Sequence, residues 1–441
     1  MKILFDFSFD FFVSAKEGIV VYNSFLFQSL LENYPNLEIE IYTNEINVKT
    51  LQQSMLTYWD KFKNRIYIIT PSFTRKWYQI NLFKYVFCAI KQNLYELLHK
   101  ITKNKHYYNR TNKWKNNKHN LYLMYSLHEL IAKSDADVAF NDIVGLTGTH
   151  YFSGPKVFML HDLFTIPFVD LFRDSMPNID KINQNAVNNL NKYADEGTYF
   201  VTSTPYIRDE HVFKYLKNVH DCYVINYPPM LRDYSKIKLM PENDIRKKFG
   251  INGPYTFYAS QNRPNKNVIL MLKTLKRLKD KGVDFTLVTT GRMDTLKVTQ
   301  EYVKKNNLSD RIIETSQLDE QELYTLYKYS SLAVIPTIIE GLGMSGQCLE
   351  ALSFGTIPVI HAKSFGIRER LKMVGLSMKT ADLNWVDLDD DEGLAKKIEE
   401  VLKNPKPHIE KQKHIIEAYI RRTWSDVAKD YMDLFNQIVK K

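Results

Sequence analysis

The sequence has little cysteine. Its 441 residues include only three, Cys88, Cys222 and Cys348, which lie far apart along the chain. Their scatter and odd number exclude a disulfide framework and a cysteine-based metal site. We therefore expect a reducing compartment, most simply the cytoplasm.

The sequence also lacks a long hydrophobic run. No stretch approaches the roughly 20 apolar residues that a membrane-spanning helix needs. Near the amino terminus, Asp6 interrupts the apolar residues that a signal peptide would keep continuous. We therefore expect no membrane span. A chain of this length is too long for one hydrophobic core, so two or three domains are expected.

Acidic residues are absent from one strongly basic segment. The chain has a net charge of +10, and residues 100–119 contain seven Lys and Arg, no acid, and Tyr107, Tyr108 and Trp114. Three interpretations stay open: a solvated surface insert, an anionic membrane interface, and a site for single-stranded nucleic acid. The first two are favoured, and we expect no nucleic-acid partner.

Short apolar strands alternate with amphipathic helices along most of the chain. Residues 2–9 and 37–43 are typical of strands that flank a helix over 19–33, and the alternation restarts with a strand at 256–260. Such βαβ units predict parallel sheets. Between the two runs, residues 226–242 hold three prolines and no periodicity, which is typical of a linker. We predict an α/β protein with two doubly wound, Rossmann-like domains facing each other across a cleft.

The stretch IIEGLGMSGQCLEALSFGTIPVI, residues 338–360, places two carboxylates on either side of a glycine turn. A buried strand leads into Glu340, and a helix begins near Ser345, a suitable N-cap. The unpaired N–H groups of a helix N-terminus suit phosphate. Carboxylates accept hydrogen bonds from vicinal diols, which sugars and ribose both have, so one acid on each side of a phosphate-binding turn fits a nucleotide-sugar. The alternative is a plain strand–turn–helix whose two acids are solvated.

A second loop and three glycines extend this candidate ligand-binding edge. The loop SQNRPNKN follows a strand and brings Arg263 and Lys266 to the carboxyl edge of the sheet, where both can bind phosphate. Gly341 and Gly343 let a ligand approach the backbone closely, and Gly291 ends the next strand. The alternative for Arg263 and Lys266 is a charged surface loop.

Two patterns that resemble metal sites have a simpler explanation. Asp387 and Asp389 have the spacing of a metal-binding Asp-x-Asp motif, but their acidic run precedes a helix, where acids favour the dipole and the cap. The histidines His150, His161 and His361 do not follow a zinc-binding spacing. We therefore expect no metal ion.

Several of these motifs occur together, and in order, in one known family. The chain resembles a family 4 glycosyltransferase (glycosyl transferases group 1) of the GT-B type, most densely from about 255 to 400. The residues that carry the resemblance are Lys16-Glu17-Gly18-Ile19, His161-Asp162-Leu163, RPNKN at 263–267, NLSDRIIE, DEQELYTLYKYSSLAVIPTIIEGLGM, LEALSFGTIPVI and Arg422-Thr423-Trp424-Ser425. The implied domains are an acceptor-side domain at 1–235, a nucleotide-sugar domain at 236–414, and a helix at 415–441 crossing back. Residues 73–125, which hold the basic aromatic segment, have no family counterpart.

The resemblance implies sugar transfer from a nucleotide-diphosphate donor with retention of configuration and without a metal or cofactor. Lys266, with Arg263 and the helix terminus at Ser345, would neutralise the leaving diphosphate. Glu350 would bind the ribose, Glu340 would bind the donor sugar, and His161 would lie near the reacting carbon. The remaining implied donor-binding positions are Gly18, Gly291, Gly341 and Gly343. No paired nucleophile and acid is evident, so front-face attack by the acceptor hydroxyl is expected.

Two positions depart from the family pattern. Nine residues separate Glu340 from Glu350 where the family usually has seven, and Gln261 stands where an arginine is common. Two rival functions stay open: a nucleotide-sugar epimerase on the same fold, and a catalytically silent binding module. For a transferase, we expect a hexose donor and a glycan or lipid-linked acceptor in bacterial surface polysaccharide synthesis, on the inner face of the cell membrane.

Overall fold

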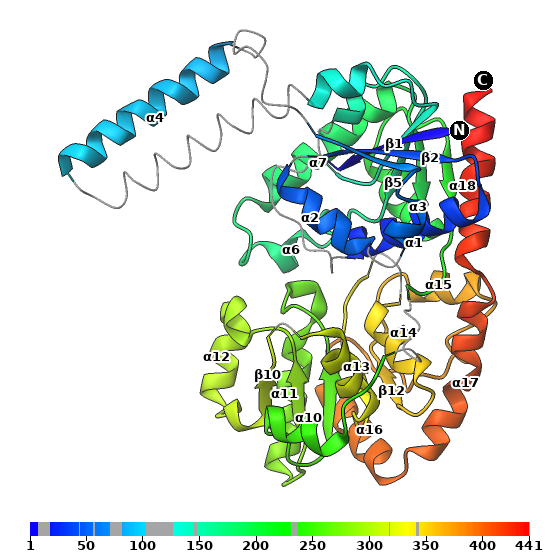
Figure 1. Ribbon diagram of the computed structural model, residues 1–441. Helices are drawn as coiled ribbons and strands as arrows, with labels where there is room; N and C mark the ends of the chain where they lie inside the picture. The colour runs from blue at the N-terminus through cyan, green and yellow to red at the C-terminus, as the bar shows by residue number, and fades with distance from the viewer. Residues whose placement is uncertain are drawn as a thin grey trace.

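The protein consists of two α/β units stacked one on the other (Figure 1). The computed structural model describes residues 1–7, 18–43, 45–55, 58–70, 82–102, 127–144, 148–230, 237–316, 318–340 and 344–440. We call the part built around strands β1 to β7 the first unit and the part built around β8 to β12 the second unit.

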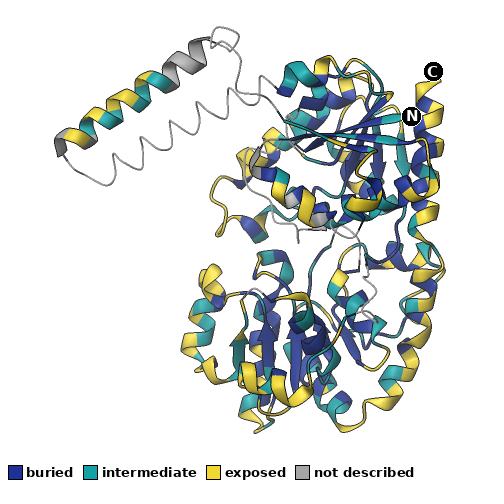
Figure 2. Cartoon of the chain, viewed as in Figure 1, coloured by how far each residue is buried: buried dark blue, intermediate teal, exposed yellow. Residues whose placement is uncertain are grey.

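The first unit is built on a seven-stranded parallel sheet with the order β3-β2-β1-β4-β5-β6-β7. Its strands are β1 (Lys2–Phe7), β2 (Glu38–Thr43), β3 (Ile66–Ile69), β4 (Val138–Asn141), β5 (Lys156–Leu160), β6 (Tyr199–Thr202) and β7 (Cys222–Val224). The strands are largely buried because helices cover the sheet, which is why they are nearly continuous apolar runs (Figure 2).

The helices of the first unit connect these strands. Their bounds are α1 (Gly18–Asn33), α2 (Glu45–Ser54), α3 (Trp59–Phe62), α4 (Leu82–Thr102), α6 (Val169–Phe172), α7 (Ile179–Asp195), α8 (Pro205–Ile207) and α9 (Phe213–Tyr215). One of them, α4, stands away from the body of the molecule (Figure 1).

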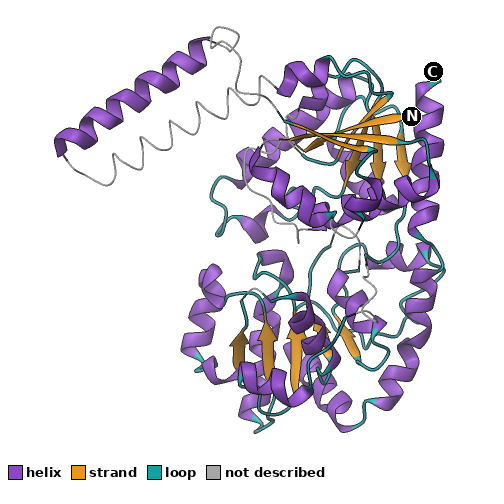
Figure 3. Cartoon of the chain, in the orientation of Figure 1, coloured by secondary structure: helices purple, strands orange, loops and turns teal. Residues whose placement is uncertain are grey.

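The second unit repeats the parallel layout with shorter strands (Figure 3). Its strands pair in the orders β10-β9-β8 and β11-β12, and a parallel bridge from Thr256 to Leu332 joins the two groups. The strands are β8 (Tyr255–Tyr258), β9 (Thr286–Thr289), β10 (Ile312–Glu314), β11 (Ala333–Ile335) and β12 (Val359–His361). The predicted α/β class with parallel sheets is therefore confirmed.

The remaining helices surround the second sheet and then return to the first unit. They are α10 (Glu242–Phe249), α11 (Val268–Asp280), α12 (Lys297–Lys305), α13 (Glu320–Lys328), α14 (Gly346–Ser353), α15 (Ile367–Met373), α16 (Asp391–Lys403), α17 (Lys406–Ile420) and α18 (Trp424–Val439). Among the helices that the structure describes, none is long and apolar enough to cross a membrane.

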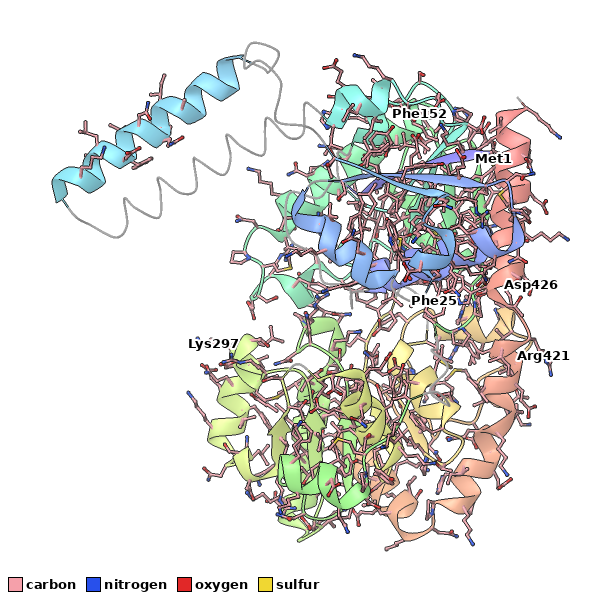
Figure 4. The ribbon with its side chains drawn as sticks, viewed as in Figure 1. Met1, Phe25, Phe152, Lys297, Arg421 and Asp426 are labelled. Atoms are coloured by element: carbon pink, nitrogen blue, oxygen red, sulfur yellow. The ribbon has the colours of Figure 1, made fainter. Side chains whose placement is uncertain are left out.

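The last helix completes the core of the first unit. Helix α17 still packs in the core of the second unit, whereas Val427, Tyr431 and Phe435 of α18 are buried with the residues of β1 and α1. At this contact Phe25 stacks on Trp424 with ring centroids 5.3 Å apart. The labels Phe25 and Asp426 in Figure 4 mark where α1 and α18 meet. The chain therefore crosses between the units twice, once before α10 and once before α18.

Candidate active site

The candidate site is built where strand ends of the second unit meet strand ends of the first. Short loops after β8 and β11 carry Lys266 and Glu340, and the loop after β5 carries His161 and Asp162. In parallel sheets the carboxyl ends of neighbouring strands lie at one edge, which brings Lys266 and Glu340 together within the second unit.

Lys266 and Glu340 form a partly buried ion pair. The Lys266 ammonium donates to Glu340 Oε1, which also accepts from the Thr337 hydroxyl at 3.1 Å. The two side chains are 14% and 19% exposed. Burial lowers the pKa of Lys266, but the Glu340 carboxylate outweighs it, so the pKa is raised and the lysine stays charged.

Asparagines of the loop RPNKN explain why these two residues meet. The Asn267 side chain donates to the carbonyls of Pro336 at 3.1 Å and Leu388 at 2.8 Å. The Asn265 side chain donates to Ile339 O at 3.3 Å. These bonds hold the lysine loop against the segment that ends in Glu340. Within this motif, the two asparagine amides therefore have a structural role that is distinct from that of the cationic side chains.

Arg263 and Gln261 are neighbours in the same loop. The Arg263 Nε donates to Gln261 Oε1 at 2.9 Å, and the arginine is exposed. Its charge reaches Lys266, whose pKa it lowers slightly. The glutamine at the family's arginine position therefore orients the arginine two residues later.

Gly291 packs against the backbone of this loop. A Cβ at this position would lie 2.5 Å from Ser260 O and 2.8 Å from Asn262 N, so any side chain would collide with the backbone. The structure thus places Gly291 against the protein's own loop. Its predicted contact with a donor stays a prediction.

The helix after the glycine turn begins as expected. Ser345 is the N-cap of α14, and its hydroxyl accepts from Cys348 N at 3.2 Å. Gly341 and Gly343 lie outside the described residues. The amino-terminal loop with Lys16 and Glu17 also lies outside them, and Gly18 is the first residue of α1.

Glu350 occupies a separate position on α14. Among the described residues it forms no hydrogen bond or ion pair with Lys266 or Glu340. Burial raises its pKa to about 7, and the neighbouring Tyr327 hydroxyl opposes that rise. Tyr327, a buried residue of α13, was not singled out from the sequence because a tyrosine on an apolar helix face gives no functional signal.

The first unit contributes the His161–Asp162 turn. His161 Nε2 lies 3.4 Å from Asp142 Oδ2, and the Tyr22 ring meets the imidazole edge-on at 5.1 Å between centroids. Burial raises the pKa of Asp162 to about 7, and the charges of Glu340 and Lys266 act on the same carboxyl. Helix α6, which follows this turn, contacts residues Pro264–Lys266 of the second unit.

The acidic run near the end of the second unit serves helix α16 and local ion pairs. Asp387 pairs with Lys363 at 2.8 Å, and Asp390 is the N-cap of α16, accepting from Gly393 N at 2.8 Å. Within the described parts of the chain, no group of three or more His, Cys, Asp and Glu side chains is arranged to hold a metal.

Comparison with known proteins agrees with this architecture. Residues 241–422 match the family model described as "Glycosyl transferases group 1". A 110-residue stretch is 26% identical to a Bacillus subtilis protein described as "Uncharacterized glycosyltransferase YqgM". That stretch covers 25% of this chain and 30% of the relative's own length.

Solved structures resemble the whole chain. Sucrose-phosphate synthase from Thermosynechococcus elongatus has a TM-score of 0.62 at 13% identity, covering 99% of this chain and 98% of its own. Anabaena HepE in complex with UDP and glucose has a TM-score of 0.61 at 13% identity, covering 99% of this chain and 100% of its own. The chain has the GT-B fold, as the sequence motifs implied.

Proposed function

We propose that this protein is a retaining glycosyltransferase of family 4 that moves a hexose from a nucleotide-diphosphate donor to a glycan or lipid-linked acceptor. The observation that carries the proposal is the Lys266–Glu340 pair, held by the RPNKN loop where the second unit contacts helix α6 of the first. The family match over 241–422 includes both members of the pair. HepE, with the same fold, binds UDP and glucose, which supports a nucleotide-sugar as the donor.

The two residues of the ion pair are chemically suited to the diphosphate and to the sugar of such a donor. A diphosphate offers Lys266 a replacement for its carboxylate partner, and sugar hydroxyls offer hydrogen-bond donors to Glu340. Exchanging partners in this way keeps each buried charge compensated, and an uncompensated charge would be costly. Arg263 and the helix terminus at Ser345 add positive potential for the same diphosphate. Glu350 would accept hydrogen bonds from the ribose.

The proposed reaction needs no metal and no side-chain nucleophile. The bond between the anomeric carbon and the donor phosphate oxygen breaks, while the acceptor oxygen bonds to that carbon from the same face. The acceptor proton passes to the departing phosphate oxygen. Lys266 stabilises the charge that develops on that oxygen, and loss of one such group typically costs about 10²–10³ in kcat.

A membrane-bound acceptor is supported by the element that stands off the first unit. Helix α4 exposes the large apolar side chains Ile90, Leu94 and Leu97, at positions that share one helix face. It runs directly into the basic aromatic segment 100–119. An apolar stripe beside a cluster of cations fits an anionic membrane surface. We propose a cytoplasmic enzyme that works on the inner membrane face, in the synthesis of a bacterial surface polysaccharide.

The first test is a thermal-shift panel of UDP-, GDP- and dTDP-linked sugars on the wild type and on Lys266→Ala. At 100 times its dissociation constant, a native-state ligand adds about 2.7 kcal/mol of stability. We expect one nucleotide class to stabilise the wild type and Lys266→Ala to lose most of that shift. Lys248→Ala is the matched control, because Lys248 forms a lysine–glutamate pair with Glu322 elsewhere in the second unit.

The same proteins separate the rival functions. A transferase needs an acceptor to consume the stabilising donor at full rate, whereas an epimerase converts the donor alone into a stereoisomer. A binding module shows the thermal shift without consuming the donor under either condition. Absence of any shift across the panel would contradict the proposed function.

A further inference from the structure

A buried carboxylate behind His161 has no role in the site described so far. Asp142 directly follows β4, and His161 directly follows β5, the neighbouring parallel strand. Their loops therefore begin at the same sheet edge. Asp142 is 1% exposed, so its carboxylate is removed from water.

The partners of this carboxylate are few and specific. Asp142 Oδ2 accepts from the Asn23 side chain of α1 at 2.8 Å and lies 3.4 Å from His161 Nε2. Across the described parts of the chain, His161 is the only basic side chain within ion-pair distance of it. Asp142 Oδ1 and Asn23 Oδ1 are buried without a hydrogen-bond partner.

Such a group is costly to retain for stability alone. A buried charge without a full set of partners destabilises the fold, and an apolar residue would fill the space at lower cost. A different buried carboxylate of the same sheet, Asp6, shows the contrast. Asp6, on β1, accepts from the Thr149 backbone N–H at 2.7 Å and from its hydroxyl at 3.1 Å. Asp6 thus secures a loop, while Asp142 faces an imidazole.

We propose that Asp142 is a positioning residue that holds the imidazole of His161 with its proton on Nε2, leaving Nδ1 free to accept a hydrogen bond from a substrate hydroxyl. A carboxylate can only accept, so the imidazole nitrogen facing it must carry the proton. The Tyr22 ring, which meets the imidazole edge-on, limits its rotation. The part of this inference that concerns catalysis rests on the proposed function, while the tautomer of His161 does not.

Asp142→Asn removes the negative charge of the side chain and keeps its shape. Because Asp142 Oδ2 both accepts from Asn23 and faces Nε2, the amide oxygen can take its place, but the negative charge that favours a proton on Nε2 is lost. We expect kcat to fall about 10–100-fold, by analogy with removal of an outer partner of a metal-binding histidine. The KM for the donor should stay near the wild-type value, because the diphosphate-binding groups lie on the second unit.

A double-mutant cycle with His161→Ala distinguishes positioning from a structural role. If Asp142 acts through His161, Asp142→Asn adds less than about twofold once the imidazole is gone. A drop in kcat as large as in the wild-type background would overturn the proposal. Asp6→Asn is the matched control in the same sheet, and it should leave kcat per folded molecule unchanged in both backgrounds.

The tautomer itself can be read without any substrate. Nitrogen-15 NMR of the imidazole, with the His161 signals assigned by their loss in His161→Gln, should show Nε2 protonated in the wild type and in Asp6→Asn. In Asp142→Asn it should show a smaller fraction of the form protonated on Nε2 alone. A wild-type ring protonated on Nδ1 alone would overturn the proposal even if Asp142→Asn does not fold. If the tautomer is as proposed but no nucleotide-sugar is turned over, the proposed function fails and the positioning of His161 stands.

Discussion

At the residue scale, the site contains buried ionisable side chains whose pKa values depend on which charged groups lie beside them. Lys266 keeps its charge because Glu340 is beside it, whereas Asp162 and Glu350 lack a direct cationic partner among the described residues and have pKa values raised to about 7. Perturbed groups of this kind gather at functional sites more often than elsewhere. A bound nucleotide-sugar would bring hydroxyl donors to these carboxylates and favour their charged forms.

Glu350 gives a pH-dependent prediction for stability. Its pKa is raised from 4.5 to about 7 in the folded protein, so the folded state binds its proton more tightly than the unfolded state. The free energy of unfolding should therefore fall as pH rises from about 4.5 to 7, and then level off. Glu350→Gln removes this contribution.

Urea unfolding at pH 4.5 and pH 8 measures the effect. We expect Glu350→Gln to have a higher free energy of unfolding than the wild type at pH 8. The difference between variant and wild type should be smaller at pH 4.5. Subtracting the wild-type curve isolates this group from Asp162, which titrates in the same range. An equal difference at both pH values would contradict the assignment of a raised pKa to Glu350.

At the element scale, α4 is the clearest departure from a compact two-unit enzyme. Its exposed side chains Ile90 and Leu97 are 59% and 55% exposed, well above the level expected for an apolar helix face in a core. Lys91, Tyr95 and Leu98 of the same helix each have an interaction partner. The face with Ile90, Leu94 and Leu97 is therefore an exposed apolar surface.

The membrane role of α4 can be tested with vesicles. Leu94→Glu should reduce co-sedimentation with vesicles containing phosphatidylglycerol by at least about tenfold, because burial of one leucine is worth about 1.5–3 kcal/mol. Val298→Glu is the matched control, since Val298 is 56% exposed on α12 of the other unit. Equal binding to phosphatidylcholine vesicles, or an equal loss in the control, would count against an anionic membrane partner.

At the scale of the whole molecule, one buried arginine joins the units. Arg370 of α15 is 2% exposed and donates to the Asn226 side chain and, at 2.7 Å, to Tyr227 O in the connecting segment. Its guanidinium also lies over the rings of Tyr227 and Tyr419. Arg422 donates to Asn226 O as well, so both chain crossings are tied at one point.

Arg370→Met should weaken this joint more than its size suggests. The variant leaves the part-buried side-chain oxygen of Asn226 and the buried carbonyl of Tyr227 with fewer donors, and each buried group left unsatisfied costs about 1–3 kcal/mol. We expect a lower urea midpoint and unfolding in two separated steps, followed by tryptophan fluorescence and circular dichroism. Arg292→Met, which removes an exposed pair with Asp294, should keep the wild-type profile. A single transition at the wild-type midpoint would show that Arg370 does not couple the units.

The sequence by itself determined the local features of this protein. The period of its apolar residues specifies strands and helices, because burial of a strand or helix face depends on neighbours along the chain. The helix beginning at Ser345 and the strand-end loop with Lys266 follow from the same local chemistry. These features were enough to predict an α/β fold with parallel sheets, and the ordered motifs were enough to indicate the GT-B type.

Only the tertiary structure decided which of these residues meet. Lys266 and Glu340 lie 74 positions apart, and Asn23 and Asp142 lie 119 apart. Their contacts depend on which strands are neighbours, and no periodicity encodes that order. Asp142, Tyr327 and Arg370 therefore gave no signal in the sequence, because a lone acid, tyrosine or arginine acquires its function from the partners that burial forces upon it.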